Sequence, residues 1–130
     1  MIAPRSLVLI DTSAWIEALR VRGDEKIRAE VYGLIQDGRA AWCHIVRLEL
    51  WAGAQPKEIP RLKELRRTIR DLETSEPVWN EACELAQRAR GKGFTVPAGD
   101  LLIVACARFH RAELVHKDRH FDQLKALEHR

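Results

Sequence analysis

The sequence predicts an α/β fold, in which an open and mostly parallel sheet is covered by helices on both faces. Short apolar segments rich in β-forming residues alternate along the chain with longer segments whose apolar residues recur at helical spacing. Hydrophobic residues make up 46% of the chain, which suits a globular protein and argues against disorder. The length of 130 residues is that of one compact domain, so we expect residues 1–130 to form a single domain.

The first half of the chain begins with a continuous apolar run at residues 7–10, which is typical of a strand buried on both faces. The side chains of Asp11, Thr12 and Ser13 then offer the hydrogen-bond acceptors that cap a helix N-terminus. Glycine and aspartate end the helices that follow, because they favour the backbone conformations of turns. These signals predict, in order, a strand over residues 7–10, helices over 14–19 and 25–36, a strand over 40–44 and a helix over 45–53.

The second half of the chain is richer in helical patterns. Apolar residues such as Val78, Ala82 and Leu85 recur one helical turn apart, and the segment Gly91-Lys92-Gly93 ends that pattern. Another strongly apolar run follows Asp100. The patterns predict helices over residues 60–72 and 77–90, an extended piece over 94–96, a helix over 101–109, a strand over 113–116 and a last helix over 121–127.

Acidic residues follow or interrupt several of these elements. Asp11 comes directly after the first strand, and Asp118 comes just after the strand predicted over residues 113–116. In open α/β sheets the functional crevice lies at the carboxyl ends of the strands, so two neighbouring strands would bring these carboxylates face to face. Asp100 opens an apolar helix, and Glu49 lies inside another. These acids are therefore candidates for one shared site.

Carboxylates gathered in this way favour a bound cation. An unpaired buried carboxylate is very costly, and neighbouring carboxylates raise one another's pKa unless a cation neutralises them. Oxygen ligands without a thiolate favour Mg²⁺ or Mn²⁺ over zinc, and such ions activate water for phosphodiester hydrolysis. Each acid also has a simpler interpretation: Asp11 as a helix cap, Asp100 as a first-turn acid, Glu49 as a solvated helix residue and Asp118 as a surface acid with local ion pairs.

Four segments of the sequence resemble the motifs of PIN domains, especially those of the VapC toxins of bacterial toxin–antitoxin pairs. Residues 10–17 resemble the opening motif, and residues 46–53 resemble the second, in which an acid is followed by leucine and later by glycine. Residues 100–107 and 114–121 resemble the third and fourth motifs. The motifs occur in the family's order and cover nearly the whole chain.

This resemblance implies a PIN-like domain, with a parallel sheet sandwiched by helices (α/β/α). It also implies Mg²⁺- or Mn²⁺-dependent cleavage of RNA, a homodimer, and a VapB-type antitoxin whose tail covers the active site. Ser13 matches the small hydroxyl residue that supports the first acid. The residues that match the family's catalytic, metal-binding acids are Asp11, Glu49, Asp100 and Asp118.

One position departs from the family pattern. The family commonly has threonine where this chain has His116, shortly before Asp118. Threonine would place a hydroxyl near the metal, whereas His116 could donate an N–H group, bind a phosphate when charged, or bind metal. A histidine at the end of a strand can instead be satisfied by the backbone alone. We interpret His116 as a supporting residue of the site, with these roles open.

An RNA substrate would require positive charge around the acids. The formal net charge of +3 and the sequence pI of about 9.0 favour a polyanionic partner. A solvated helix face is the alternative interpretation of any run of basic residues. The candidates for phosphate contacts are Arg61, Lys63, Arg66, Arg67 and Arg70 in one predicted helix, and Arg88, Arg90 and Lys92 at the end of another.

Cysteine usage and the lack of long apolar runs predict a cytoplasmic protein without membrane association. No apolar run approaches the roughly 20 residues of a membrane span, and no signal-peptide pattern is present. The three well-separated cysteines favour a reducing compartment over a disulfide framework. The alternatives to a VapC-type toxin are a PIN-type nuclease of RNA processing, a non-catalytic binding module, and a zinc site made from Cys43, His44, His116 and His120.

Overall fold

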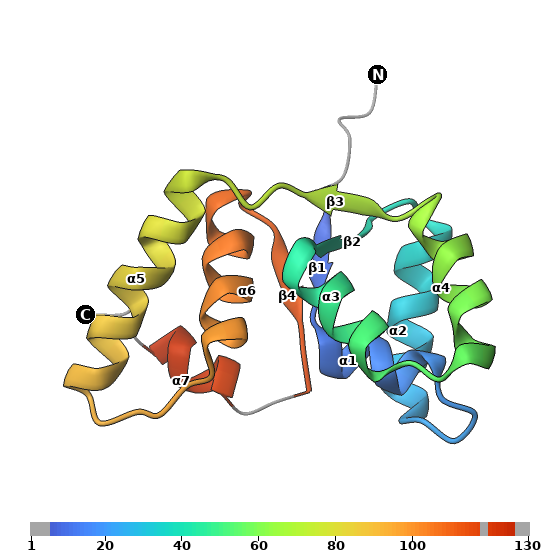
Figure 1. Cartoon of the computed structure of the whole chain (residues 1–130), viewed down its shortest axis with the longest axis horizontal. Helices are drawn as coiled ribbons and strands as arrows, with labels where there is room; N and C mark the ends of the chain where they lie inside the picture. The colour runs from blue at the N-terminus through green and yellow to red at the C-terminus, as the bar shows by residue number, and fades with distance from the viewer. Residues whose placement is uncertain (1–5, 118–119, 127–130) are drawn as a thin grey trace.

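The computed structural model describes residues 6–117 and 120–126, and within them a four-stranded sheet (Figure 1). All strand pairs are parallel, and the order across the sheet is β3-β2-β1-β4. The strands are β1 (Val8–Ile10), β2 (Ala40–Cys43), β3 (Arg70–Leu72) and β4 (Glu113–Val115). Because β1 and β4 are parallel neighbours, the segments that follow them leave the sheet side by side at its carboxyl edge.

Helices cover both faces of this sheet. The connections from β1 to β2 and from β2 to β3 step across the sheet in one direction, whereas the connection from β3 to β4 returns in the other. Right-handed crossovers therefore place two sets of helices on opposite faces, as Figure 1 shows, and the predicted α/β/α fold is confirmed. One face carries α1 (Thr12–Leu19), α2 (Glu25–Gln36), α3 (His44–Gly53), η1 (Pro56–Glu58) and α4 (Ile59–Arg66), and the other carries α5 (Glu76–Gly91), α6 (Ala98–Phe109) and α7 (His120–Ala126).

Local sequence signals fix the ends of the helices next to the sheet. The Asp11 side chain accepts a hydrogen bond from the Ala14 N–H group and caps α1. Asp24 caps α2 in the same way, by accepting from two N–H groups of its first turn. After α2, Gly38 has φ = 69°, a left-handed conformation that favours glycine and turns the chain into β2. The predicted cap at Asp11 and the predicted bounds of α2 are confirmed.

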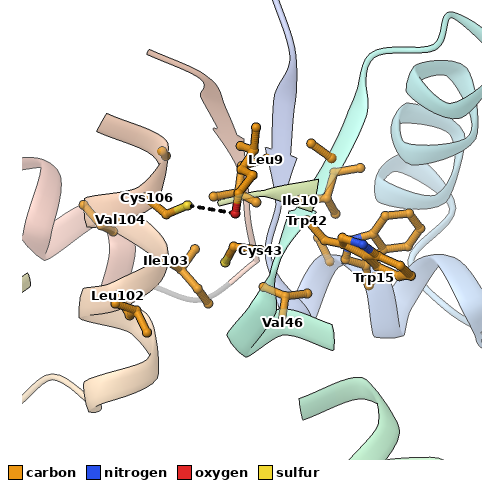
Figure 2. Packing of buried hydrophobic residues seen from close by; sticks show 14 of the residues in the cluster. Leu9, Ile10, Trp15, Trp42, Cys43, Val46, Leu102, Ile103, Val104 and Cys106 are labelled. Atoms are coloured by element: carbon orange, nitrogen blue, oxygen red, sulfur yellow. Dashed lines mark hydrogen bonds between the residues drawn. The ribbon is translucent and has the colours of Figure 1, made fainter. Parts of the chain in front are cut away.

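The core lies on both faces of β1 and β2, whose residues are all buried. On one face, the rings of Trp15 and Trp42 pack with their centroids 5.4 Å apart. On the other face, buried residues 101–107 of α6 cover the sheet, and the Cys106 thiol donates a hydrogen bond to the Leu72 carbonyl oxygen at 3.7 Å (Figure 2). Burial of apolar surface is the main favourable contribution to folding, so these layers hold the strand ends in place.

The helix predicted over residues 60–72 is wrong in its second half. Helix α4 ends at Arg66, and Arg70–Leu72 form the edge strand β3. This strand pairs with β2 and buries only Leu72, while its first two residues are exposed. So short an edge strand shows no apolar alternation, and its structure is decided by pairing with a distant segment. Arg70 therefore does not belong to the helical row of basic side chains.

The other predicted helices and strands are confirmed to within three residues at each end, except that the predicted end of the last helix, residue 127, lies outside the described residues. The extended piece predicted over residues 94–96 lies in the loop between α5 and α6. Within the described part of the chain, every helix is too short or too polar to span a membrane.

Candidate active site

Asp11 lies at the carboxyl edge of the sheet, between the end of β1 and the start of α1. Its side chain is buried, with 2% of the residue exposed. Its Oδ1 accepts the Ala14 N–H group at 2.8 Å, and its Oδ2 accepts the Ser13 hydroxyl at 2.8 Å. The backbone N–H group of Lys117 in turn donates to the Ser13 hydroxyl oxygen at 3.3 Å. Ser13 thus links the first acid to the chain segment that follows β4.

Burial raises the pKa of Asp11 above its ordinary value, because the ionised carboxylate loses hydration. The hydrogen bonds from Ala14 and Ser13 lower this pKa, and so does the charge of His116. The carboxylate of Asp100 raises it further, so Asp100, on the first turn of α6, lies within electrostatic reach of Asp11. Additional positive charge at this place would stabilise the ionised form of Asp11.

Glu49 reaches the same region from α3. Its Oε1 accepts a hydrogen bond from the Thr12 hydroxyl, on the first turn of α1. Its Oε2 lies against Gly99 of α6, where an added Cβ atom would stand only 3.0 Å from this oxygen. The residue is exposed, so its carboxylate is open to water and also held by a donor. Glu49 therefore contacts the sequence neighbours of both Asp11 and Asp100.

Three of the four predicted acids thus lie at or against the first turns of α1 and α6. The fourth, Asp118, lies outside the described residues. Among the described residues, no group of three or more His, Cys, Asp or Glu side chains is placed to hold a metal ion. The donor chemistry nevertheless fits a hard divalent cation, since carboxylate oxygens are the ligands that Mg²⁺ and Mn²⁺ prefer.

His116 follows β4 and is held by α7. Its Nε2 is 3.7 Å from Oδ1 of Asp122, and its ring centroid is 5.1 Å from that of Phe121. Its buried Nδ1 has no hydrogen-bond partner among the described residues. The described contacts of His116 are therefore with side chains of α7 rather than with a backbone acceptor, and its charge lowers the pKa of Asp11.

A second buried acid lies further along α1. Glu17 is 8% exposed, and its Oε1 accepts the Asp24 N–H group at 2.9 Å. Its Oε2 accepts a hydrogen bond from Nη1 of Arg20 at 2.9 Å, and Nζ of Lys117 lies 3.1 Å from its Oε1. These donors lower the pKa of Glu17, and the Asp24 N–H group has the largest effect. Glu17 is thus held as a carboxylate by groups from three segments of the chain.

Thr12, Gly99 and Glu17 are not among the site residues predicted from the sequence. Glu17 could have been found, because it is an acid between apolar residues of a helix, as Glu49 is. Thr12 lies next to the first acid in the sequence, but its neighbours give no indication that its hydroxyl binds α3. Gly99 has no local signal, because its importance comes from a side chain that is distant in the sequence.

The zinc site considered for Cys43, His44, His116 and His120 is not supported by the described residues. Cys43 is buried, and the neighbouring thiol of Cys106 on α6 lowers its pKa. His44 is exposed and lines a surface groove with Arg47. The side chain of His120 lies outside the described residues. No metal-binding group that includes these side chains is present in the described part of the chain.

We expect Glu17→Gln to destabilise the protein at neutral pH and to lose this effect in acid. The pKa of Glu17 is lower in the folded protein than in the unfolded chain. Its ionised form therefore stabilises the fold above the ordinary pKa, and this stabilisation disappears as the pH falls through the lower folded value. Thermal unfolding should show a gap between the midpoints of variant and wild type that closes toward about pH 3. A gap that is the same in acid and at neutral pH would contradict this expectation.

Comparison with known proteins gives matches along most of the chain. The PIN domain family matches residues 8–127. VapC ribonuclease Mb1587 of Mycobacterium bovis is 33% identical over 126 residues, covering 93% of this chain and 93% of that protein. Ribonuclease VapC21 of Mycobacterium tuberculosis is 31% identical over 105 residues, covering 78% of this chain and 76% of that protein. The solved structure of VapBC2 from Rickettsia felis, bound to a DNA fragment from its promoter, contains a chain of the same fold. The TM-score is 0.76 and the sequence identity is 22%, and the match covers 90% of this chain and 92% of that one.

Proposed function

Because this chain belongs to the PIN-domain family and, within it, to the VapC ribonucleases, we propose that it is the toxic endoribonuclease of a VapBC-type toxin–antitoxin pair. The observation that carries the proposal is the contact of Glu49 with both Thr12 and Gly99, which brings it beside the sequence neighbours of Asp11 and Asp100 at the carboxyl edge of the sheet. Carboxylates gathered at this edge are suited to metal-assisted hydrolysis of phosphodiesters. We further propose that residues 1–130 form one PIN domain and that it acts in the cytoplasm.

The proposed cofactor is Mg²⁺ or Mn²⁺. When bound, such an ion activates water for attack on phosphorus and stabilises the leaving oxygen. The chain keeps the acids in place for this purpose, since two hydrogen bonds fix Asp11 and the Thr12 hydroxyl fixes Glu49. Because Asp11 is buried and repelled by Asp100, it gains more from a nearby cation than an exposed carboxylate would. The proposed ligands are Asp11, Glu49, Asp100 and Asp118, with Ser13 and His116 as supporting residues.

The RNA backbone is expected to contact basic side chains beside this site. Arg90 and Lys92 are exposed at the end of α5, and the loop after them leads to the first turn of α6, where Asp100 lies. On α4, by contrast, Arg61 is paired with Glu64 at 3.8 Å. We therefore favour Arg90 and Lys92 as phosphate contacts, which give affinity without sequence preference.

We expect Gly99→Ala to reduce RNA cleavage without reducing stability. The added methyl group would displace the Glu49 carboxylate, which is a flexible side-chain end, and its next contact is Cγ1 of Ile45 at 3.7 Å. Alanine favours a helix over glycine by up to about 1 kcal/mol, so the thermal midpoint should be kept or raised. Cleavage should fall by about tenfold or more, as for other changes that move a ligand. The control is Gly91→Ala, where an added Cβ meets nothing within 4 Å, and equal activity of the two variants would contradict the role of Glu49.

The proposed partners are a second copy of the chain and a VapB-type antitoxin. Two large apolar side chains, Trp79 on α5 and Phe109 on α6, are 50% and 48% exposed, and we propose these two helices as the candidate interface. Light scattering on the purified chain should give about twice its mass of 14.9 kDa. A monomer at tens of micromolar, on the order of ordinary interface affinities, would contradict the homodimer.

Cleavage of purified RNA by the purified chain tests the proposed activity. We expect cleavage with Mg²⁺ or Mn²⁺, loss of cleavage in EDTA, and recovery when either ion is added in excess. A single-stranded DNA of the same sequence serves as the comparison substrate. Cleavage that is unaffected by EDTA would contradict the metal, and intact RNA under every condition would favour a non-catalytic binding module.

A further inference from the structure

We propose that Lys117 is a positioning residue, which fixes the end of β4 against the first turn of α1 by binding the buried carboxylate of Glu17. This inference rests on the proposed function, because the segment it fixes leads to Asp118 and contacts the residue that supports Asp11. It concerns side chains that none of the four motifs includes as a metal ligand.

Lys117 is attached to α1 at two points. Its backbone N–H group donates to the Ser13 hydroxyl oxygen at 3.3 Å, and Ser13 donates to Oδ2 of Asp11 at 2.8 Å. Its Nζ lies 3.1 Å from Oε1 of Glu17 and 4.0 Å from Oδ2 of Asp24. One residue therefore ties the segment after β4 to the first acid through its backbone and to the later part of α1 through its side chain.

The Glu17 carboxylate, which accepts this lysine, is also held by other donors. The Asp24 N–H group and the Arg20 side chain each donate to a different oxygen of Glu17, at 2.9 Å in both cases. The turn that carries Asp24 closes tightly on α1, because an added Cβ on Gly23 would stand 1.8 Å from the Glu17 carbonyl oxygen. The Glu17 carboxylate thus has a fixed position when Lys117 binds it.

This arrangement differs from an ordinary surface ion pair. The side chain of Glu17 is 11% exposed, whereas that of Glu64, in the surface pair with Arg61, is 71% exposed. Exposed pairs contribute little because two mobile side chains must be ordered in water. In the pair of Lys117 and Glu17 the carboxylate is already held by two other donors, so only the lysine has to be ordered, and the contact can place the backbone that follows β4.

We call the contact of Lys117 with Glu17 the clamp. Its loss should leave the protein folded but hold the segment after β4 less firmly against α1. In Lys117→Gln, the backbone N–H group of residue 117 should leave Ser13 more often, and the support of Asp11 weakens with it. Loss of a residue that orients a metal ligand typically lowers metal affinity or activity by 10- to 100-fold. We therefore expect Mn²⁺ affinity and RNA cleavage to fall by about tenfold or more.

The test compares Lys117→Gln with Lys117→Arg, which keeps the charge, and with Lys57→Gln, a change of an exposed lysine in η1. Amide hydrogen exchange at residue 117 is measured relative to that of Leu9 in the buried strand β1. Mn²⁺ affinity is measured by the spin resonance of the free ion. We expect faster exchange at residue 117 alone and weaker Mn²⁺ binding in Lys117→Gln, substantial recovery in Lys117→Arg, and wild-type behaviour in Lys57→Gln.

Three results would overturn the inference. The first is an exchange rate and Mn²⁺ affinity of Lys117→Gln within about twofold of the wild type, the usual error of additivity. The second is acceleration at residue 117 and Leu9 together, because that would indicate a general loss of stability. Combining Lys117→Gln with Glu17→Gln should add no further loss of Mn²⁺ affinity, whereas independent losses would also count against the clamp.

Failure of the proposed function is separable from failure of this inference. If Asp11→Asn binds Mn²⁺ as tightly as the wild type, the proposed metal site is wrong. The exchange rate at residue 117 still decides whether Lys117 fixes the segment after β4, because that measurement requires neither metal nor RNA.

Discussion

Replacing Asp11 by asparagine is expected to abolish RNA cleavage while making the metal-free protein more stable. Asparagine keeps the helix cap, because its side-chain oxygen can still accept the Ala14 N–H group. It removes the negative charge that burial and Asp100 disfavour. Activity is lost because the residue no longer provides an anionic ligand for a divalent cation. The same substitution at Asp100 should remove activity and relieve the same repulsion.

The gain in stability should depend on pH in a defined way. Since the pKa of Asp11 is raised in the folded protein, the unfolded chain releases this proton at a lower pH than the folded protein does. Above the ordinary pKa of 3.8, ionisation of Asp11 therefore costs stability in the wild type. In EDTA, the thermal midpoint of Asp11→Asn should exceed that of the wild type at neutral pH, and the difference should vanish below about pH 3.

The matched control is Glu30→Gln, an amide substitution of an exposed acid on α2. It should change neither RNA cleavage nor the thermal midpoint in EDTA. Full cleavage by Asp11→Asn or by Asp100→Asn would exclude that acid from the site. A lower midpoint of Asp11→Asn in EDTA at neutral pH would show that the charge of Asp11 is compensated within the metal-free protein.

Gly23→Ala is expected to cause the largest loss of stability of any single methyl addition proposed for this chain. A Cβ atom at this position would lie 1.8 Å from the carbonyl oxygen and 2.8 Å from the carbonyl carbon of Glu17. These are backbone atoms of α1, so the overlap cannot be relieved by rotating a side chain. The turn between α1 and α2 would have to open, which breaks the hydrogen bond from the Asp24 N–H group to Glu17.

The expected destabilisation is about 3 kcal/mol or more, at the upper end of what overpacking costs. Urea unfolding measures it directly. The control is Gly33→Ala on α2, where an added Cβ meets nothing within 4 Å, and where alanine should stabilise the helix by about 0.5–1 kcal/mol. If Gly23→Ala were as stable as the wild type, the close approach of this turn to α1 would be wrong.

The fold could be predicted from the sequence because its central elements carry strong local patterns. Residues 7–10 form an apolar run long enough for a buried strand, and residues 25–36 show helical spacing bounded by Asp24 and Gly38. The edge strand Arg70–Leu72 could not be predicted, because it is short, polar and defined by its pairing with β2. Local patterns thus identify elements that are buried by their own composition and miss those defined by a distant partner.

In the candidate site, too, local sequence patterns predict some features, and contacts between distant segments could not be predicted. Asp11 could be placed at the carboxyl edge because it directly follows a buried strand, and Glu49 and Asp100 stand out as acids in apolar helices. The contact of Glu49 with Gly99 joins segments far apart in the sequence, so neither residue predicts it. The contact of Lys117 with Glu17 could not be predicted for the same reason, because the two residues are far apart in the sequence and no local pattern relates them.

Sequencing of RNA ends after brief induction of the intact chain, beside Asp11→Asn at the same protein level, tests the proposed ribonuclease activity most directly. The account predicts new RNA ends at defined positions in cells that produce the intact chain. These ends should be absent in cells that produce Asp11→Asn, because this substitution removes an anionic metal ligand and is expected to leave the rest of the fold unchanged. New ends of equal number and position with both proteins, or none with either, would contradict the assignment of this chain as a metal-dependent endoribonuclease whose site is built on Asp11.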